Sequence, residues 1–449
     1  MTFYVPETIC AIATAPGRAG IAVLRLSGQH LIPLAQTLTG GKTPRPRYAM
    51  LTDFLAADGT AMDNGLLLYF PAPHSFTGED VLELHGHGGT VVMNRLLTRC
   101  IELGARMAQP GEFTQRAFLN GKLDLAQAES VADLIDAASE AAAKSALRSL
   151  QGVFSQHLQQ LTEQLITLRM LIEATLDFPE EEIDFLVATD AHTKLSHLRQ
   201  QLEQLATSAR QGVILREGMH VVLIGQPNVG KSSLMNALAG EEVAIVTDIA
   251  GTTRDTVRES IIIDGVPMHI IDTAGLRDTT DIVEQRGIER TWQAVARADI
   301  ALLLLDNRDG ITHDVNTILT LLPDALPRLF VFNKIDLSAM PPSLTEYHGH
   351  PAIHLSALTH AGIDLLKAKL LELIGFHTTT EDVFLARTRH LDAIRRAHHH
   401  LILACQDWHQ TDIVAEELRM AQSALGEITG EFSSDDLLGV IFSRFCIGK

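Results

Sequence analysis

A glycine-rich loop is the first segment of the sequence whose residue types and spacing could do chemistry. The run HVVLIGQPNVGKSSLMNALAG contains the pattern GxxxxGK[ST] from Gly225 to Ser232. Glycines let backbone N–H groups converge on phosphate oxygens, while Lys231 can reach the terminal phosphates and the Ser232 hydroxyl can bind Mg²⁺. Because an apolar strand pattern precedes the loop and a helical pattern follows it, the segment predicts a nucleotide phosphate site rather than a chance glycine turn.

A second segment, FVFNKID, carries groups that can read a purine base. It ends a predicted strand with Asn333, Lys334 and Asp336. A carboxylate at Asp336 can accept the N1 and N2 protons of guanine, whereas adenine has an acceptor at N1 and no N2 amine. The later run IHLSAL supplies Ser356 and Ala357, whose backbone can support the base. These residues predict selectivity for guanine nucleotides.

The segment HIIDTAG completes the set. It places Asp272 at a strand end, where a carboxylate can hold the water shell of a metal ion, and Gly275 where a backbone N–H can meet a γ-phosphate. In this order the motifs resemble those of translation-factor-like GTPases, with GTTRD from Gly251 to Asp255 as the switch and Thr253 as a second Mg²⁺ ligand beside Ser232. Repeated βαβ units then predict a mostly parallel sheet with one antiparallel strand near its edge.

The resulting set of predicted GTP-binding residues spans five segments. Its members are Asn228, Val229, Gly230, Lys231, Ser232, Ser233, Thr247, Asp248, Ile249, Ala250, Gly251, Thr252, Thr253, Asp272, Thr273, Ala274, Gly275, Asn333, Lys334, Asp336, Ser356, Ala357 and Leu358.

One departure from Ras-like enzymes concerns the attacking water. Leu276 follows DTAG, where a water-orienting glutamine is expected. Two substitutes are available: Glu284, which is otherwise a solvated helix charge, and a monovalent cation in place of an arginine finger. The predicted K⁺ ligands are the Asn228 side-chain oxygen and the carbonyls of Thr247, Ile249 and Thr252.

The elements that must position these motifs fall into several domains, because 449 residues exceed what one hydrophobic core organises. Residues 1–120 mix short strands, around Ile21 to Leu26 and in GLLLYFP and DVLELHG, with a helix closed by Gly104. Residues 121–215 have apolar residues three and four positions apart, the period of helices, and the last of these helices is expected to end at Gly212. Residues 377–449 return to the same helical period. The α/β segment 216–376 is therefore predicted as an insertion that splits a helical bundle.

Composition limits the partners and the compartment. The 36 Lys and Arg against 55 Asp and Glu give a formal charge of -19, so any RNA contact must come from a local patch or a partner protein. The cysteines form no CxxC pair, which argues against a zinc site and a disulfide framework. Neither a leader nor a membrane span is expected, and the protein is expected to be cytoplasmic. The four cysteines are Cys10, Cys100, Cys405 and Cys446.

The inserted GTPase, the split helical region and several further runs together resemble the tRNA modification GTPases of the MnmE (TrmE) family. These runs are SFTGEDVLELHGHGG, PGEFTQRAFLNGKLDLAQAE, EITGEFSSDDLLGVIF and the terminal FCIGK. The resemblance implies a folate-binding-like N-terminal domain that forms a homodimer, and a heterotetramer with an FAD-containing partner, MnmG (GidA). It also implies an aminomethyl or carboxymethylaminomethyl group placed on C5 of the wobble uridine, U34, of tRNA. The implied cofactors are K⁺, Mg²⁺ and a 5,10-methylene- or 5-formyl-tetrahydrofolate, and the GTPase domains pair when K⁺ and GTP are bound.

The same resemblance assigns a folate site. Arg25, Glu83, Lys122 and Lys449 match its residues. Cations suit the glutamate carboxylate of a folate, and a carboxylate suits the pterin amine and ring N–H. Without the resemblance, Arg25 would be a strand-edge charge and Lys122 a solvated loop residue.

Cys446, fourth from the last residue, has three interpretations. A prenylation signal needs aliphatic residues where Gly448 stands, so that interpretation is poor. An ordinary tail is the default for a terminus. The apolar run DLLGVIFSRF could dock the tail, and the resemblance places the tail beside the folate, so Cys446 is hypothesised as a catalytic or redox thiol.

Two other functions stay open at this point. A nucleotide-switched binding protein, such as a ribosome-assembly factor, would be expected to carry a basic RNA-binding module. A folate enzyme complete in itself, with a regulatory GTPase, would turn over one-carbon units without an FAD partner.

Overall fold

The computed structural model describes residues 7–177, 190–239, 259–272, 295–296, 298–310, 316, 319–320, 322–376, 383–431, 435–443 and 445–448. The chain forms two compact units, each described by itself below: residues 1–132, 149–198 and 396–449, and residues 133–148 and 199–395. Several predicted site residues lie outside the described part: residues 247–253, 273–275, Glu284 and Lys449. The domain boundaries expected at residues 120, 215 and 376 stay a prediction.

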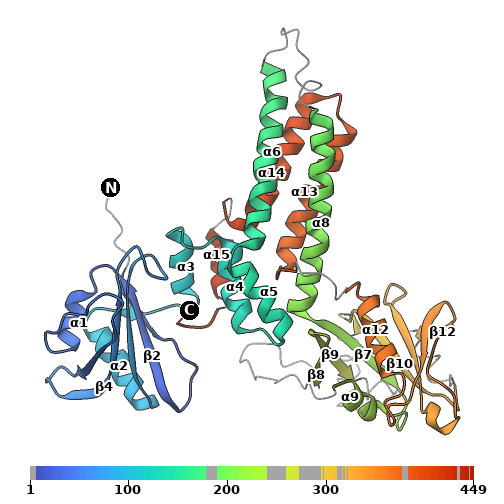
Figure 1. The fold of residues 1–449 in the computed structure, drawn as a ribbon, viewed down its shortest axis with the longest axis horizontal. Helices are drawn as coiled ribbons and strands as arrows, with labels where there is room; N and C mark the ends of the chain where they lie inside the picture. The colour runs from blue at the N-terminus through green and yellow to red at the C-terminus, as the bar shows by residue number, and fades with distance from the viewer. Residues whose placement is uncertain are drawn as a thin grey trace, which may run out of the picture. The chain divides into compact units, whose positions relative to one another are not determined.

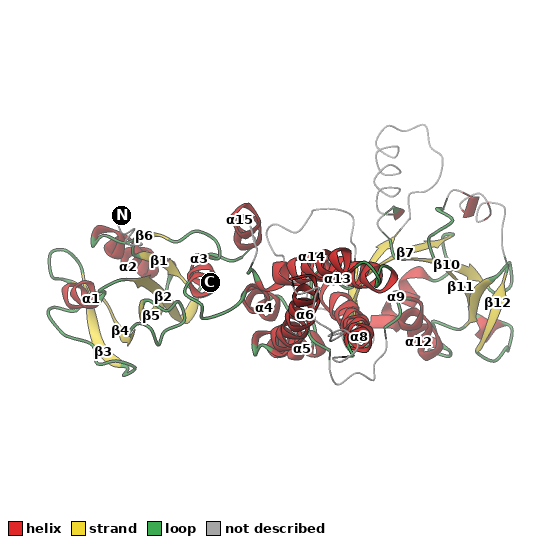
Figure 2. Cartoon of the chain, turned by 90° about the horizontal axis from the view of Figure 1, so that it is seen from above, coloured by secondary structure: helices red, strands yellow, loops and turns green. Residues whose placement is uncertain are grey.

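The first unit contains a six-stranded sheet in the order β3-β4-β5-β2-β1-β6. Figure 1 labels β2 and β4 of this sheet, and Figure 2 labels all of its strands. Neighbouring strands are antiparallel except β1 and β6. The strands expected near Ile21 and in GLLLYFP and DVLELHG are confirmed as β2, β4 and β5. The strand bounds are β1 (Ile9–Ile12), β2 (Ala19–Gly28), β3 (Met50–Leu55), β4 (Ala61–Phe70), β5 (Asp80–Gly88) and β6 (Arg106–Met107).

Helices cover this sheet on both faces, because β1 carries buried apolar side chains on each face, Cys10 on one and Ile9 and Ala11 on the other. Helices α1 (Ile32–Leu38) and α2 (Thr90–Glu102) pack on one face, where Leu24 and Leu26 are fully buried. Gly104, with φ +99°, follows α2 as expected. On the other face Phe113 of α3 (Glu112–Leu119) packs against the β1 side chains. The alternation therefore turns Arg25 of β2 toward the α3 face.

The helical part of the first unit centres on the pair α6 (Val153–Asp177) and α14 (Thr411–Thr429) (Figures 1 and 2). Both helices present buried apolar residues at alternating steps of three and four, which is the period of a helix face. On α6 these residues are Leu158, Leu161, Leu165, Leu168 and Ile172. On α14 they are Val414, Leu418, Ala421, Leu425 and Ile428. The short α15 (Asp435–Ser443) packs with α4 (Leu125–Ile135) through Leu438, Ile441 and Phe442.

The second unit contains a seven-stranded sheet in the order β12-β13-β11-β10-β7-β9-β8. The expectation of one antiparallel strand is wrong in number, because β8 and β12 are both antiparallel, one at each edge. The β12–β13 turn, His348 and Gly349, has positive φ at both residues, which is the geometry of a tight hairpin. The bounds are β7 (Met219–Gly225), β8 (Glu259–Ile263), β9 (Val266–Asp272), β10 (Ile300–Asp306), β11 (Arg328–Asn333), β12 (Ser343–Tyr347) and β13 (His350–His354).

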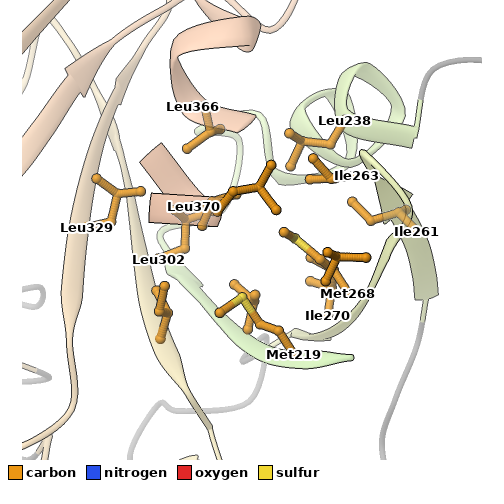
Figure 3. Packing of buried hydrophobic residues seen from close by; sticks show 14 of the residues in the cluster. Met219, Leu238, Ile261, Ile263, Met268, Ile270, Leu302, Leu329, Leu366 and Leu370 are labelled. Carbon is orange, nitrogen blue, oxygen red and sulfur yellow. The ribbon is translucent and has the colours of Figure 1, made fainter. Parts of the chain in front are cut away.

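Apolar side chains from the sheet and two helices form the core of this unit. Figure 3 shows Leu238 of α9 (Lys231–Ala239) and Leu366 of α12 (Ile363–Leu373) in the same packed cluster as Met268 and Leu302 of the sheet. Ala146 of α5 (Glu140–Leu150) belongs to the same cluster. This packing fixes the sheet and α9, which carry the nucleotide motifs.

The helix predicted to end at Gly212 continues as α8 (Ala191–Glu217), so that boundary is wrong. A Cβ at Gly212 would lie 2.1 Å from the Phe384 carbonyl oxygen. Gly212 therefore permits a close backbone approach inside the helix, and Gly218, with φ +69°, follows its true end. The remaining elements are the 3₁₀ turn η1 (Ile335–Leu337) and α13 (Thr388–Gln406). Within the described ranges, no helix is both long and apolar enough to cross a membrane.

Candidate functional site

The predicted phosphate loop joins the end of β7 to the start of α9. Asn228 and Gly230 both have positive φ, 65° and 99°. At Gly230 a Cβ would lie 2.4 Å from the Asn333 amide nitrogen, so the loop has no room for a side chain there. Lys231 Nζ donates to the Gly225 carbonyl at 2.9 Å across the loop, and Ser232 is exposed in the first turn of α9. The backbone N–H groups in the first turn of a helix point toward its N-terminus, so this turn can offer them to an anion bound at the loop.

The predicted base-binding segments, residues 333–336 and 356–358, are together called the base loop below. Hydrogen bonds join them directly to the phosphate loop. Asn333, which is 3% exposed, donates from Nδ2 to the Val229 carbonyl at 2.8 Å and accepts the Ala357 N–H at 2.9 Å. Ser356 Oγ donates to Asp336 Oδ1 at 2.6 Å, which orients that carboxylate. The structure thus brings together residues from three of the predicted GTP-binding segments. Leu358 is 77% exposed and makes the outer end of this loop.

Lys334 makes a second tie, through a residue that the sequence interpretation missed. Its Nζ donates to the Asn228 carbonyl at 2.7 Å and lies 3.0 Å from Asp306 Oδ2. Asp306 ends β10, which lies between β7 and β11, so its carboxylate stands between the two loops. A sequence signal was present: the wholly apolar run IALLLL ends in this aspartate, and carboxyl ends of parallel strands gather at one edge.

Nearby charges and burial shift the pKa of the Asp306 carboxyl in opposite directions. Hydrogen bonds from the Arg308 side chain, helped by Lys334 and opposed by burial, hold the pKa of the Asp306 carboxyl well below its ordinary value. The carboxylate is therefore ionised wherever the protein is folded near neutral pH.

The second predicted site gathers around Arg25 in the first unit. Arg25 donates to Glu83 Oε1 from Nε at 3.0 Å and from Nη2 at 2.9 Å. Glu83 uses its other oxygen for His85 Nε2, 3.2 Å away, so His85 joins the pair although no sequence motif singled it out. The Arg25 guanidinium also lies 6.0 Å from the centre of the Phe113 ring.

The C-terminal segment 445–448, called the tail below, lies against this site. Arg25 Nη1 donates to the Gly448 carbonyl at 3.4 Å, and the Gly111 N–H donates to the Cys446 carbonyl at 3.4 Å. Phe445 is buried against Phe442, while Cys446 is exposed. The docking expected of the DLLGVIFSRF run is therefore present, and it leaves the Cys446 thiol accessible.

Lys122, predicted for the same site, is held elsewhere. It donates to the Pro73 carbonyl at 3.1 Å and is exposed. Among the described residues, no hydrogen bond joins Lys122 to Arg25 or Glu83. The structure thus brings together Arg25, Glu83 and the tail, but it does not bring Lys122 into the same hydrogen-bonded group.

A buried network of ion pairs anchors α3 beside this site. No local pattern in the sequence indicated this network. Arg116 donates to Glu79 at 2.9 Å and to Glu112 at 3.0 Å, and Ser27 donates to Glu79 at 2.7 Å. Arg106 binds both oxygens of Glu112. Burial opposes ionisation of Glu112, but its bonds from Arg106, the Gln109 N–H and Arg116 lower its pKa to about 2.

Comparisons with known proteins extend over nearly the whole chain. Residues 8–122 match the family described as GTP-binding protein TrmE N-terminus, and residues 125–446 match the MnmE helical domain. The protein named tRNA modification GTPase MnmE from Chromobacterium violaceum is 70% identical over 99% of each chain. Its namesake from Laribacter hongkongensis is 65% identical over 99% of this chain and 100% of its own. A part of the chain also resembles Era in complex with MgGDPNP and nucleotides 1506-1542 of 16S ribosomal RNA, at 28% identity and a TM-score of 0.28, covering 40% of this chain and 66% of that one. The resemblance expected from the motifs is confirmed, and the chain belongs to the MnmE family of tRNA modification GTPases.

Proposed function

We propose that this chain is a K⁺-stimulated GTPase that works with an FAD-containing partner, MnmG (GidA), on the wobble uridine of tRNA. The product is an aminomethyl or carboxymethylaminomethyl group at C5 of U34, and its one-carbon unit comes from a 5,10-methylene- or 5-formyl-tetrahydrofolate. Family membership supports the tRNA assignment. The proposed assembly is a homodimer through the N-terminal domain that forms a heterotetramer with MnmG, in the cytoplasm.

The single observation that carries the GTPase proposal is the double tie between the base loop and the phosphate loop. Asn333 reaches the Val229 carbonyl and Lys334 reaches the Asn228 carbonyl, at 2.8 and 2.7 Å. These bonds fix the spacing between a phosphate-binding backbone and a base-binding carboxylate, Asp336. A ligand with guanine at one end and phosphates at the other fits that arrangement.

The hydrolytic step needs charge stabilisation and an oriented water. Ser232 and Thr253 are proposed to hold Mg²⁺, and Asn228 with the carbonyls of residues 247, 249 and 252 to hold K⁺. A cation there supplies the positive charge that an arginine finger gives other GTPases. Glu284 is proposed to orient the attacking water, because Leu276 cannot. A Glu284→Ala protein that hydrolysed GTP at the unsubstituted rate would assign water orientation to another group.

The tail site is proposed to bind the folate and present a thiol. Arg25, Glu83, Lys122 and Lys449 are the proposed folate-binding residues. The support is the pairing of Arg25 with Glu83 beside the docked tail, which leaves Cys446 exposed. Cys446 is proposed as a catalytic thiol that acts as its thiolate.

The first test is the GTP hydrolysis rate of the full-length protein in K⁺ and then in Na⁺ at equal ionic strength. We expect a large K⁺ advantage that Asn228→Ala removes. Asn236→Ala is the matched control, because Asn236 is an exposed asparagine on α9 outside the predicted site. Equal rates in both salts would refute the cation mechanism.

The second test separates modification from hydrolysis. Cells that lack the gene are complemented with the unsubstituted chain or with Cys446→Ser, and the nucleosides of their tRNA are analysed by mass spectrometry. We expect Cys446→Ser to leave GTP hydrolysis intact and to remove the U34 modification. Cys405→Ser, at a partly buried cysteine of α13, is the control. Normally modified tRNA with Cys446→Ser would rule out a catalytic role for the thiol.

A further inference from the structure

Asp306 occupies the point of the second unit where the two nucleotide loops meet. It is the last residue of β10, and it pairs in register with Asn333 at the end of β11. Its side chain is 5% exposed. A buried carboxylate is costly unless cations and donors surround it, so its partners define what it does.

Those partners come from two sides. Arg308 donates from Nε to Oδ1 at 3.0 Å and from Nη2 to Oδ2 at 2.7 Å, and the Arg308 N–H also reaches Oδ1 at 3.0 Å. Lys334 Nζ lies 3.0 Å from Oδ2. Arg308 is exposed and local, whereas Lys334 belongs to the base loop, so the two contacts have different consequences.

The contact with Lys334 continues to the phosphate loop. The same Nζ donates to the Asn228 carbonyl at 2.7 Å, which makes a chain from Asp306 through Lys334 to Asn228. Lys334 and Asn228 both have positive φ, 69° and 65°, a conformation that is uncommon for residues other than glycine. The Lys334 ammonium group thus connects these two positive-φ residues, and Asp306 holds the ammonium group in place.

We propose that Asp306 is a positioning residue for nucleotide and cation binding: it holds Lys334 on the Asn228 carbonyl and so sets the backbone from which the Asn228 side chain meets the cation. The cation part of this inference rests on the proposed K⁺ site, while the nucleotide part requires only that the site binds guanine nucleotide. Asp306 touches neither ligand and acts through Lys334. Asp336, by contrast, is the residue proposed above to contact the base and set selectivity.

The test compares Asp306→Asn with Asp309→Asn in the full-length protein. Both variants remove one negative charge, but Asp309 is exposed, and within the described residues no hydrogen bond or ion pair joins it to Lys334. The measurements are the dissociation constant of a fluorescent GDP analogue and the K⁺ concentration that gives half-maximal GTP hydrolysis. Loss of a charged hydrogen bond predicts that Asp306→Asn weakens both by about tenfold or more, with Asp309→Asn unchanged.

A double-mutant cycle separates positioning from general destabilisation. Lys334→Met should reproduce the loss, and Asp306→Asn should add little in that background, because the two residues act as one unit. The preference for GTP over ITP, which depends on Asp336, should stay the same. Fully additive losses, or equal effects of Asp306→Asn and Asp309→Asn, would overturn the proposal.

The outcomes also distinguish this inference from the proposed function. If the unsubstituted protein hydrolyses GTP equally in K⁺ and Na⁺, the cation proposal fails, and the GDP dissociation constants still decide the role of Asp306. If Asp306→Asn does not fold by circular dichroism, Lys334→Met and Lys334→Arg decide instead: a loss with methionine that arginine partly restores supports the positioning role, and no loss with methionine overturns it.

Discussion

Replacing Gly111 by alanine should release the tail from the Arg25 site. Gly111 has φ +68°, and a Cβ there would lie 2.7 Å from the Phe442 carbonyl oxygen and 2.9 Å from Phe445 Cβ. The left-handed backbone costs an alanine about 1 kcal/mol. Displacing Phe445 forfeits the burial of an aromatic side chain, about 2 kcal/mol. Only the second term distinguishes the docked tail from the released tail, and about 2 kcal/mol raises the released population by about 30-fold.

Gly121→Ala is the matched control for backbone strain. Gly121 has φ +65°, almost the same as Gly111, but a Cβ there meets no atom within 4 Å. It therefore carries the conformational cost without the clash. Any difference between the two variants reports the contact with the tail.

Hydrogen–deuterium exchange of the C-terminal peptide is the assay. We expect faster exchange of the Phe445 amide, which is bonded to the Phe442 carbonyl, in Gly111→Ala but not in Gly121→Ala. U34 modification should fall in Gly111→Ala while the GTP hydrolysis rate stays unchanged. Equal exchange rates of the Phe445 amide in both variants would refute the argument that the tail packs against Gly111.

Three further predictions concern the nucleotide site and the α3 anchor. Lys231→Ala should abolish GTP turnover, because it removes the charge aimed at the terminal phosphates; retained turnover in a phosphate-release assay would contradict the assigned loop. Asp336→Asn should weaken GTP binding by about tenfold or more and narrow the preference over XTP, measured by competition with a fluorescent nucleotide. Glu112→Gln should lower the thermal unfolding midpoint at pH 7. Because folding lowers the pKa of Glu112 from 4.5 to about 2, its ionised form contributes about 3 kcal/mol above pH 4.5, and this contribution is lost as the pH falls toward 2. The difference between Glu112→Gln and the unsubstituted protein should therefore shrink across that range, and a constant difference would contradict the role of the charge.

Local patterns in the sequence were sufficient for most secondary structure and for the nucleotide motifs. The alternation in DVLELHG, the steps of three and four along residues 153–177 and the GxxxxGK[ST] loop each depend on residues close in the chain. Periodicity and turn chemistry act over the same short distances, so they can be identified without a structure. We inferred that an insert splits the helical region because the helical spacing of apolar residues occurs both before and after the insert.

The tertiary structure decided what depends on contacts between distant residues. The sequence suggested that Gly212 ends a helix, whereas the close approach of the Phe384 backbone explains why a glycine occupies this position inside the helix. The role of Asp306 became visible only from the position of β10 between β7 and β11. The contact of the tail with Gly111 joins residues more than 300 positions apart, and no local pattern encodes such a contact. The sequence by itself determined the chemical groups and the elements that carry them. The fold alone determined which groups meet, because burial, close approach and charge pairing are properties of positions in space.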